Sequence, residues 1–256
     1  MFEALPVIHD PVFYALAVPA VLLVGLSKSG FAAGFGSLAT PVLALTVPAP
    51  QAAAILLPLL MVMDLTGLQQ MWHDRDAALL RRLLPWGIGG VVIGALLFGL
   101  LSAKAVAGLL GVLTLGFLAQ RLFFPPRRDK PPAPAWPAWV MRACATASGF
   151  TSFVAHAGGP PMFAYLLPLR LDPRVVSATM AVFFAVINAA KVLPYAALGL
   201  LDLRNLLTSL LLVPLAPLGV WAGVWLVRRV DSTWFYRLAY LGMFLTGAKL
   251  LWDAWH

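Results

Sequence analysis

The sequence predicts an all-α integral membrane protein made of two related halves. Hydrophobic residues make up 61% of the 256-residue chain and charged residues only 11%, with a mean hydropathy of +0.89. A soluble domain of this length would carry about 25% charged residues. The deficit is too large for a globular protein, whose surface must be wetted, and no segment alternates as a barrel strand does. The composition therefore predicts a helical bundle in a lipid bilayer.

Six stretches are long enough to cross a bilayer, which takes about 20 apolar residues per helix. They are residues 52–72, 83–101, 105–124, 175–199, 205–227 and 233–255. The net charge of +8 comes from basic residues at the ends of these stretches and in loops, so it does not indicate a nucleic-acid partner. Cys144 is the single cysteine, which excludes an intrachain disulfide and a cysteine metal cluster. We expect neither a cofactor nor a metal ion.

Two sets of glycine- and proline-containing positions recur along the chain in the same order. Ser29-Gly30-Phe31 and Pro41 match Ser148-Gly149-Phe150 and Pro160 at one offset, and Pro85, Gly90 and Gly94 match Pro214, Gly219 and Gly223 at another. Glycine and proline each occur 21 times, so chance is the alternative, but two ordered sets favour a duplication. We predict a first membrane repeat at 1–124, a proline-rich basic cytoplasmic linker at 125–138 and a second membrane repeat at 139–256.

Each half opens with a helix pair that is interrupted by small residues and prolines. The first interruption is at 27–30, between helices expected at 11–26 and 31–47. The second is at 155–161, and only residues 162–169 follow before a polar segment. At a rise of about 1.5 Å per residue, that piece reaches about halfway through the hydrocarbon. This favours re-entrant half-helices that meet near mid-membrane, with two full spans as the alternative.

The basic residues predict how the chain is oriented. If each opening pair leaves and re-enters on one side, each half crosses three times and the second half is inverted relative to the first. One face then receives 13 of the 18 Lys and Arg residues and the other receives 3, which makes the rich face cytoplasmic and places both termini outside. The first residues carry no Lys or Arg before the first apolar run, so we expect this segment to be retained and not cleaved as a signal peptide.

Interrupted helices at membrane depth indicate a binding site. Irregular backbone there must be buried in protein or line a wet cavity, and inverted repeats with broken helices are typical of secondary transporters that bind substrate at the midplane. The second half-helices are expected to begin near Gly30 and Pro160. Their positive dipole ends would face the centre, which favours an anionic substrate.

Two lysines are predicted inside the membrane, where a cation is costly unless it is paired or hydrated. Lys28 lies in the first interruption, with a snorkelling or loop position as the alternative reading. Lys191 lies mid-helix, and an ion pair with Asp64 is its alternative role. His156 could hydrogen-bond an oxyanion, carry a coupling proton or cap a broken helix, and Asp64 is the second candidate for proton coupling. The predicted substrate-binding residues are Lys28, Ser29, Gly30, Gly34, Ser152, His156, Gly158, Gly159, Asn188, Lys191 and Tyr195.

These motifs resemble those of the TauE/SafE sulfite exporter family. The resemblance rests on residues 25–36 (Gly-Leu-Ser-Lys-Ser-Gly-Phe-Ala-Ala-Gly-Phe-Gly), on 151–161 (Thr-Ser-Phe-Val-Ala-His-Ala-Gly-Gly-Pro-Pro) and on Asn188-x-x-Lys191 with Tyr195. It implies a multi-pass permease of the bacterial inner membrane that moves a small sulfur-containing anion, such as sulfite, a sulfonate or sulfoacetate, usually outward. The family is also similar to the thiosulfate permeases, which are expected to pass thiosulfate along a relay of membrane cysteines. A chain with one cysteine cannot run such a relay, so thiosulfate is not the expected substrate.

Two other functions are weighed against transport by alternating access. An intramembrane enzyme acting on a lipid phosphate would need a carboxylate or histidine base beside a nucleophile. The membrane part of this chain offers one Asp, one His and several serines without an acidic motif, so we predict that it is not an enzyme. A non-transporting scaffold would not need lysines buried at helix interruptions.

Overall fold

The computed structural model describes residues 6–28, 36, 39–98 and 137–255, together with isolated positions between 100 and 119. These residues form helices and turns without a strand, which confirms the all-α prediction. Among them, four helices are long and apolar enough to cross a membrane, and a fifth span results if one pair bent by 47° counts as a single crossing. The four are α1 (Pro11–Lys28), α3 (Ala49–Met71), α4 (Ala77–Leu97) and α8 (Pro173–Ala197), and the bent pair is α9 (Leu203–Leu212) with α10 (Leu215–Arg229).

Three of the six expected spans, 52–72, 83–101 and 175–199, match α3, α4 and α8 with ends that differ by at most six residues, because the thickness of the bilayer sets their length. The stretch 205–227 is divided between α9 and α10 at residues 213–214. Pro214 lies at this bend, where a ring without an N–H interrupts the helical hydrogen-bond ladder. The expected span at 233–255 is the helix α11 (Ser232–Trp255), which is not among the four, and the stretch 105–124 lies largely outside the described residues.

Aspartates fix the first residues of five helices. Asp76, Asp172 and Asp202 stand directly before α4, α8 and α9, and each carboxylate accepts a hydrogen bond from a backbone N–H in the first turn. These caps satisfy donors that have no partner inside the helix. Asp10 before α1 and Asp231 before α11 accept in the same way, so five of the chain's ten acidic residues lie at helix starts.

The opening pair of the second half is a helix that stops inside the bundle and a short helix that continues it. α6 (Ala138–Ala155) ends before His156, and α7 (Gly159–Leu166) has eight residues before a 3₁₀ turn, η4 (Leu167–Leu169). As expected from the sequence, α7 is too short to cross a bilayer. In the first half, the described part of the expected helix at 31–47 is α2 (Ala39–Leu43), which turns follow, and the predicted start near Gly30 lies outside the described residues. Residues 29–35 lie outside the described part.

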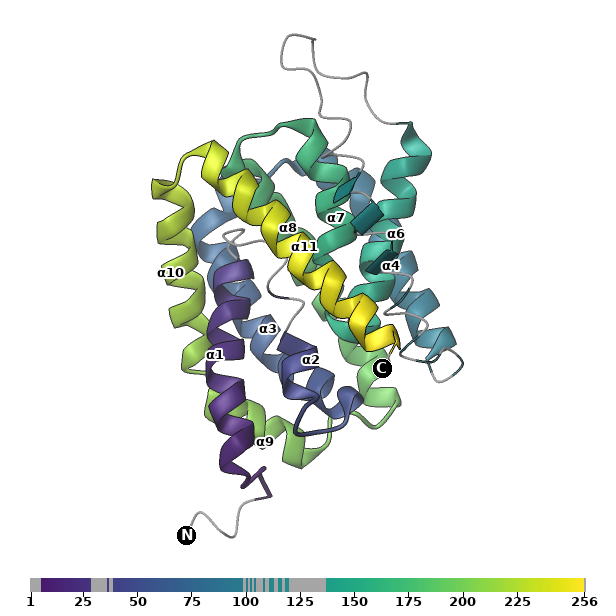
Figure 1. Cartoon of the computed structure of the whole chain (residues 1–256), viewed down its shortest axis with the longest axis vertical. Coiled ribbons are helices and arrows are strands. Elements are labelled where there is room, and N and C mark those ends of the chain that lie inside the picture. The colour runs from purple at the N-terminus through teal and green to yellow at the C-terminus, as the bar shows by residue number, and fades with distance from the viewer. Residues whose placement is uncertain are drawn as a thin grey trace.

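Helices from the two ends of the chain are interleaved. α1 packs along α10, α4 packs along α6, and α3 packs along α8 through the centre. Figure 1 shows α1 beside α10 on one side of the molecule and α4 beside α6 on the other, with α11 running obliquely across the face in view. Two buried apolar clusters follow from this arrangement, one centred on α6, α7 and α8 and the other on α1, α3 and α10.

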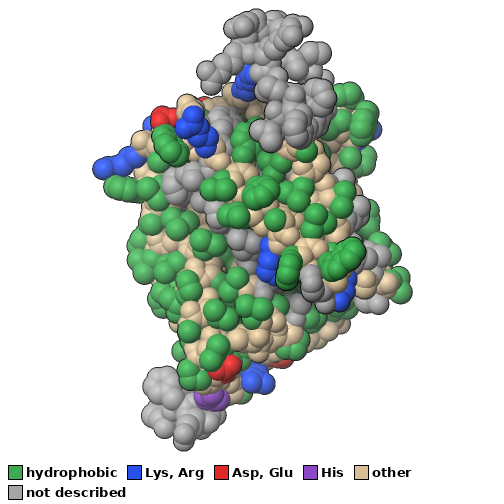
Figure 2. All heavy atoms as spheres, viewed as in Figure 1, with side chains coloured by type: hydrophobic (Ala, Val, Ile, Leu, Met, Phe, Trp, Pro, Cys, Tyr) green, Lys and Arg blue, Asp and Glu red, His purple; other side chains and the backbone are tan. Residues whose placement is uncertain are grey.

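The outer surface has the character of a membrane protein. Large hydrophobic side chains such as Leu96, Leu193 and Trp221 are exposed. Figure 2 shows one face covered mainly by hydrophobic side chains, with charged side chains gathered towards its two ends and a few more Lys or Arg side chains lower on the right. Four arginines lie over tryptophan rings near helix ends: Arg75 on Trp72, Arg142 on Trp86, Arg229 on Trp225 and Arg237 on Trp234. Such amphipathic pairs are typical of the membrane–water interface.

Glycines allow the α4–α6 and α1–α10 seams to close backbone against backbone. A Cβ added at Gly90 would lie 2.1 Å from the carbonyl oxygen of Thr146, and one at Gly149 would lie 1.9 Å from the carbonyl oxygen of Gly87. On the other side, a Cβ at Gly25 would lie 2.7 Å from the Cα of Gly219. Close backbone approach at small residues is how helices associate in membranes.

We expect Gly90→Ala to destabilise the protein by about 1–3 kcal/mol, because the new methyl group overlaps the α6 backbone. The adjacent Gly89→Ala is the matched control, since nothing lies within 4 Å of a Cβ at that position. It should leave stability unchanged or raise it by up to about 1 kcal/mol through helix propensity. Thermal unfolding of the purified variants in detergent measures both, and equal midpoints would contradict the close α4–α6 contact.

Candidate functional site

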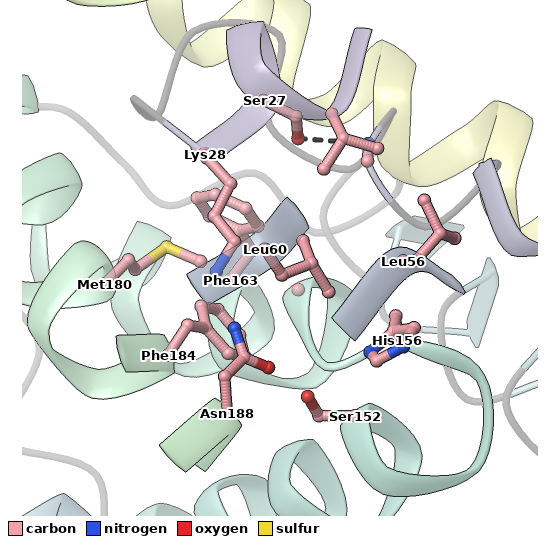
Figure 3. A pocket seen from close by; sticks show the side chains of 13 residues that line it. Ser27, Lys28, Leu56, Leu60, Ser152, His156, Phe163, Met180, Phe184 and Asn188 are labelled. Carbon is pink, nitrogen blue, oxygen red and sulfur yellow. Dashed lines mark hydrogen bonds between the residues drawn. The ribbon is translucent and has the colours of Figure 1, made fainter. Parts of the chain in front are cut away.

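A cavity of about 70 Å³ lies where the ends of α1 and α6 meet α3, α7 and α8. By the space that a buried water occupies, it holds a few waters or one small ion. Figure 3 shows its polar side chains, from Ser27, Lys28, Ser152, His156 and Asn188. The rest of its wall is apolar or glycine: Val24, Gly36, Leu56, Leu60, Gly159, Phe163, Met180 and Phe184. The Ser27 hydroxyl also accepts a hydrogen bond from the Gly36 N–H at 3.0 Å.

Lys28 reaches the cavity from the last residue of α1 and forms an ion pair with Asp64 of α3. The second oxygen of the Asp64 carboxylate accepts a hydrogen bond from the Asn188 side-chain amide of α8 at 2.6 Å. The side chains of Lys28 and Asp64 are 12% and 5% exposed, so this pair is almost fully removed from solvent. One carboxylate thus connects three helices at the edge of the cavity.

Lys191 lies directly behind the cavity wall and does not line it. Its ammonium group donates to the Ser152 carbonyl oxygen at 3.0 Å, to the Ser152 hydroxyl at 3.1 Å and to His156 Nδ1 at 2.8 Å. Three acceptors match the three N–H groups of an ammonium ion. The carbonyl belongs to the last turn of α6, where a positive charge is favoured, and it also accepts from the His156 N–H at 3.1 Å. The alternative ion pair of Lys191 with Asp64 is therefore wrong, because Asp64 pairs with Lys28.

His156 is the residue at which the chain leaves α6. Its backbone is left-handed, with φ of 53°, and its Nε2 lies 2.9 Å from the carbonyl oxygen of Ala53 in α3. A carbonyl oxygen only accepts, so Nε2 must carry a hydrogen and Nδ1 must accept from Lys191. His156 is consequently a neutral imidazole in one defined tautomer, and it connects α3 to α8.

The remaining predicted residues divide into those on the cavity wall and those behind it. Tyr195 is buried, and its hydroxyl donates to the Phe153 carbonyl oxygen at 2.6 Å, so it satisfies the end of α6 without lining the cavity. Gly159 lines the cavity at the first residue of α7, whereas Gly158 packs beneath it, where an added Cβ would lie 2.7 Å from the Ser148 carbonyl oxygen. Ser29, Gly30 and Gly34 lie outside the described residues.

The apolar part of the wall was not predicted, although the sequence carries a signal for it. Leu56, Leu60 and Asp64 follow one another at intervals of four residues on α3, and Met180, Phe184 and Asn188 do the same on α8. Residues four apart share one face of a helix. Steps of four residues toward the N-terminus from Asp64 and from Asn188 would have identified both rows of side chains, which we call the stripes on α3 and α8.

The electrostatic balance of the site is positive. Around the cavity, as far as the structure describes it, two lysines face one carboxylate, and the imidazole is neutral. One buried positive charge is left without an ionic partner among these groups, and α7 begins at the cavity with its positive dipole end. In the same residues, no three His, Cys, Asp or Glu side chains are grouped as metal ligands would be.

Several membrane-crossing helices around a buried cavity with excess positive charge have an architecture typical of a small-anion transporter. The chain belongs to the sulfite exporter TauE/SafE family, whose model matches residues 17–250. This confirms the resemblance seen in the motifs and places the chain among membrane exporters of sulfite and related sulfur anions. Neither a curated protein nor a solved structure matches it.

Removing the Tyr195 hydroxyl tests whether this residue supports the α6 terminus. We expect Tyr195→Phe to lower the free energy of unfolding by about 1 kcal/mol, because a buried carbonyl loses its donor. Tyr165→Phe in α7 is the matched control, since its hydroxyl makes no hydrogen bond to the described residues. Denaturant or thermal unfolding in detergent measures the difference, and a loss of stability in the control alone would contradict the assignment.

Proposed function

We propose that this chain exports a small sulfur-containing anion, of the sulfite, sulfonate or sulfoacetate type, by alternating access around the cavity. The observation that carries the proposal is a cavity of about 70 Å³, which suits a small anion, with two lysines and one carboxylate at or directly behind its wall. Family membership supports the choice of a sulfur anion.

We further propose that the bundle consists of two inverted repeats, with the substrate between them. The stripes on α3 and α8 support this, because Leu56, Leu60 and Asp64 lie 124 residues before Met180, Phe184 and Asn188. Asp64 and Asn188 are each the sixteenth residue of their helix. The reciprocal packing of α1 on α10 and of α4 on α6 supports the same symmetry, as do the equal lengths, 18 residues, of α1 and α6.

The proposed orientation has both termini outside the bacterial inner membrane and the linker 125–138 in the cytoplasm. The distribution of Lys and Arg in the sequence supports it. The four arginines that lie over tryptophans, Arg75, Arg142, Arg229 and Arg237, all belong to the face assigned to the cytoplasm.

Within the cavity, we assign the direct contact with the anion to Lys28 and to the hydroxyl of Ser152. Lys191 holds the Ser152 hydroxyl and adds positive charge from behind the wall. Ser27, His156 and Asn188 complete the described polar wall, and Gly159 lines the cavity beside them. Gly158 and Tyr195 act from behind it, and Ser29, Gly30 and Gly34 of the first interruption remain candidates for the facing side.

The geometry gives the enzyme alternative no support. Hydrolysis of a lipid phosphate needs a base within reach of a nucleophile or water. Both oxygens of the Asp64 carboxylate are engaged, by Lys28 and Asn188, and both nitrogens of His156 are engaged, by Ala53 and Lys191. Neither group is available as a base in this arrangement, whereas a transporter needs no such base.

Lys28→Gln tests the proposed anion contact in proteoliposomes loaded with sulfite or a sulfonate. Loss of a hydrogen bond to a charged group costs about 1.5–3 kcal/mol, so we expect the affinity to fall by about 10- to 150-fold. Arg204→Gln is the matched control, because it removes an exposed cation at the start of α9, away from the cavity.

Lys28→Gln also leaves Asp64 buried without its partner, so the double variant Lys28→Gln with Asp64→Asn separates folding from binding. Removing both charges of a buried pair is tolerated far better than removing one. The double variant should fold and still bind weakly. Efflux at the wild-type rate from Lys28→Gln would refute the site, and turnover of a lipid phosphate without anion movement would establish the enzyme alternative.

A further inference from the structure

The proposed function assigns the Lys28 ammonium group to the anion, but in the structure this group is already engaged in an ion pair. The Lys28 ammonium faces the cavity and is already bonded to the Asp64 carboxylate. Asp64 is held from the other side by Asn188, so it remains beside the cavity wall when an anion arrives. An anion that reaches Lys28 therefore lies next to a carboxylate, with little water between them to screen the repulsion.

We propose that Asp64 is the proton site of this transporter: it binds a proton when the anion takes its place on Lys28 and releases the proton when the anion leaves. This inference rests on the proposed function of the cavity. The proton comes from the aqueous side to which the cavity is open, and it neutralises the carboxylate that the anion displaces. Anion and proton then bind together and cross together, one of each per cycle, because a single carboxylate, that of Asp64, is bonded to the described lining residues Lys28 and Asn188.

Asn188 is suited to both protonation states of Asp64. Its amide N–H donates to the ionised carboxylate at 2.6 Å, as the structure shows. When Asp64 is protonated, rotation of the amide presents its oxygen as an acceptor for the carboxyl O–H. Buried polar groups need a partner in each state, and a side chain that both donates and accepts provides one without moving the helices.

Among the described residues, no second buried carboxylate lies beside Asp64. The charged groups that act on it are Lys28 from α1 and Lys191 from α8. His156 lies at the end of α6, and α9 and α10, which also pack on α3, contribute Asn205, Ser209 and apolar side chains to the buried interior. Thr40 of α2 is buried and does not titrate.

His156 is assigned a positioning role instead of proton transfer. Its Nε2–H is bound to the Ala53 carbonyl and its Nδ1 accepts from the Lys191 ammonium. A second proton on Nδ1 would direct an N–H at a cation 2.8 Å away and break that hydrogen bond. The imidazole therefore fixes Lys191, and through it Ser152, while its own protonation state stays constant.

The test uses the full chain in proteoliposomes with a trapped pH dye and a sulfonate, whose own charge is constant over the range studied. We expect the affinity of the wild type to rise as pH falls from about 8 to about 5, by at most tenfold per pH unit, because each bound anion takes up one proton. Efflux of the sulfonate should carry protons out in a 1:1 ratio, measured as alkalinisation of the lumen.

Two variants distinguish the candidate proton sites. Asp64→Asn should bind the sulfonate with an affinity that no longer depends on pH, and it should move no proton with it. His156→Gln keeps a donor and an acceptor but cannot titrate, so its anion affinity should retain the wild-type pH dependence. If Asp64→Asn does not fold, the proton-to-anion ratio of the wild type and the pH profile of His156→Gln decide the matter.

Each other outcome counts against a specific statement. A wild type that transports the sulfonate with constant affinity and no proton would refute the proton site and leave the proposed function intact. Loss of the pH dependence in His156→Gln, with its retention in Asp64→Asn, would assign the proton to the histidine. Failure to bind or move any sulfur anion at any pH would refute the proposed function itself.

Discussion

The site depends on how the chain satisfies the backbone where α6 stops inside the helix bundle. The last carbonyl groups of a helix lack donors inside it, and hydrocarbon offers none; in α6 the Ser152 carbonyl also accepts from the His156 N–H. α8 provides two donors from one face, Lys191 to Ser152 and Tyr195 to Phe153. These contacts fix the end of α6 and with it the positions of Ser152, His156 and Gly159 on the cavity wall.

The second determinant is the contact between α3 and α8. Each helix brings one stripe of side chains to the cavity, and each stripe ends in a polar residue. At that position one helix has a carboxylate and the other has the amide of nearly the same shape. A buried ion pair such as Lys28 with Asp64 adds little net stability, because desolvation offsets the attraction. We attribute its presence to function for that reason.

The sequence predicted the spans α3, α4 and α8 well, because hydropathy and length are local properties that the bilayer constrains. It also predicted that the helix beginning at Pro160 is too short to cross. The bend near Pro214 was missed, since an apolar run continues through it and only the proline marks the site. The family assignment followed from motifs that local spacing makes recognisable.

Side-chain partners could not be predicted in the same way. The sequence showed two buried lysines and one buried carboxylate, but which of them pair depends on the rotation of α1, α3 and α8 about their axes. That rotation is set by packing across the bundle and has no local signature. The tautomer of His156 follows from a carbonyl more than 100 residues away, at Ala53, and was equally hidden.

The glycine seams have a consequence for how proteins of this architecture diversify. At Gly90 and Gly149 the backbones touch, so nearly every substitution disturbs the framework. The cavity wall is different, because Leu56, Leu60 and Met180 border empty space on one side. Exchanges there alter the shape of the pocket with little effect on the seams. Selection can therefore retune the preferred cargo in small steps while the scaffold stays fixed.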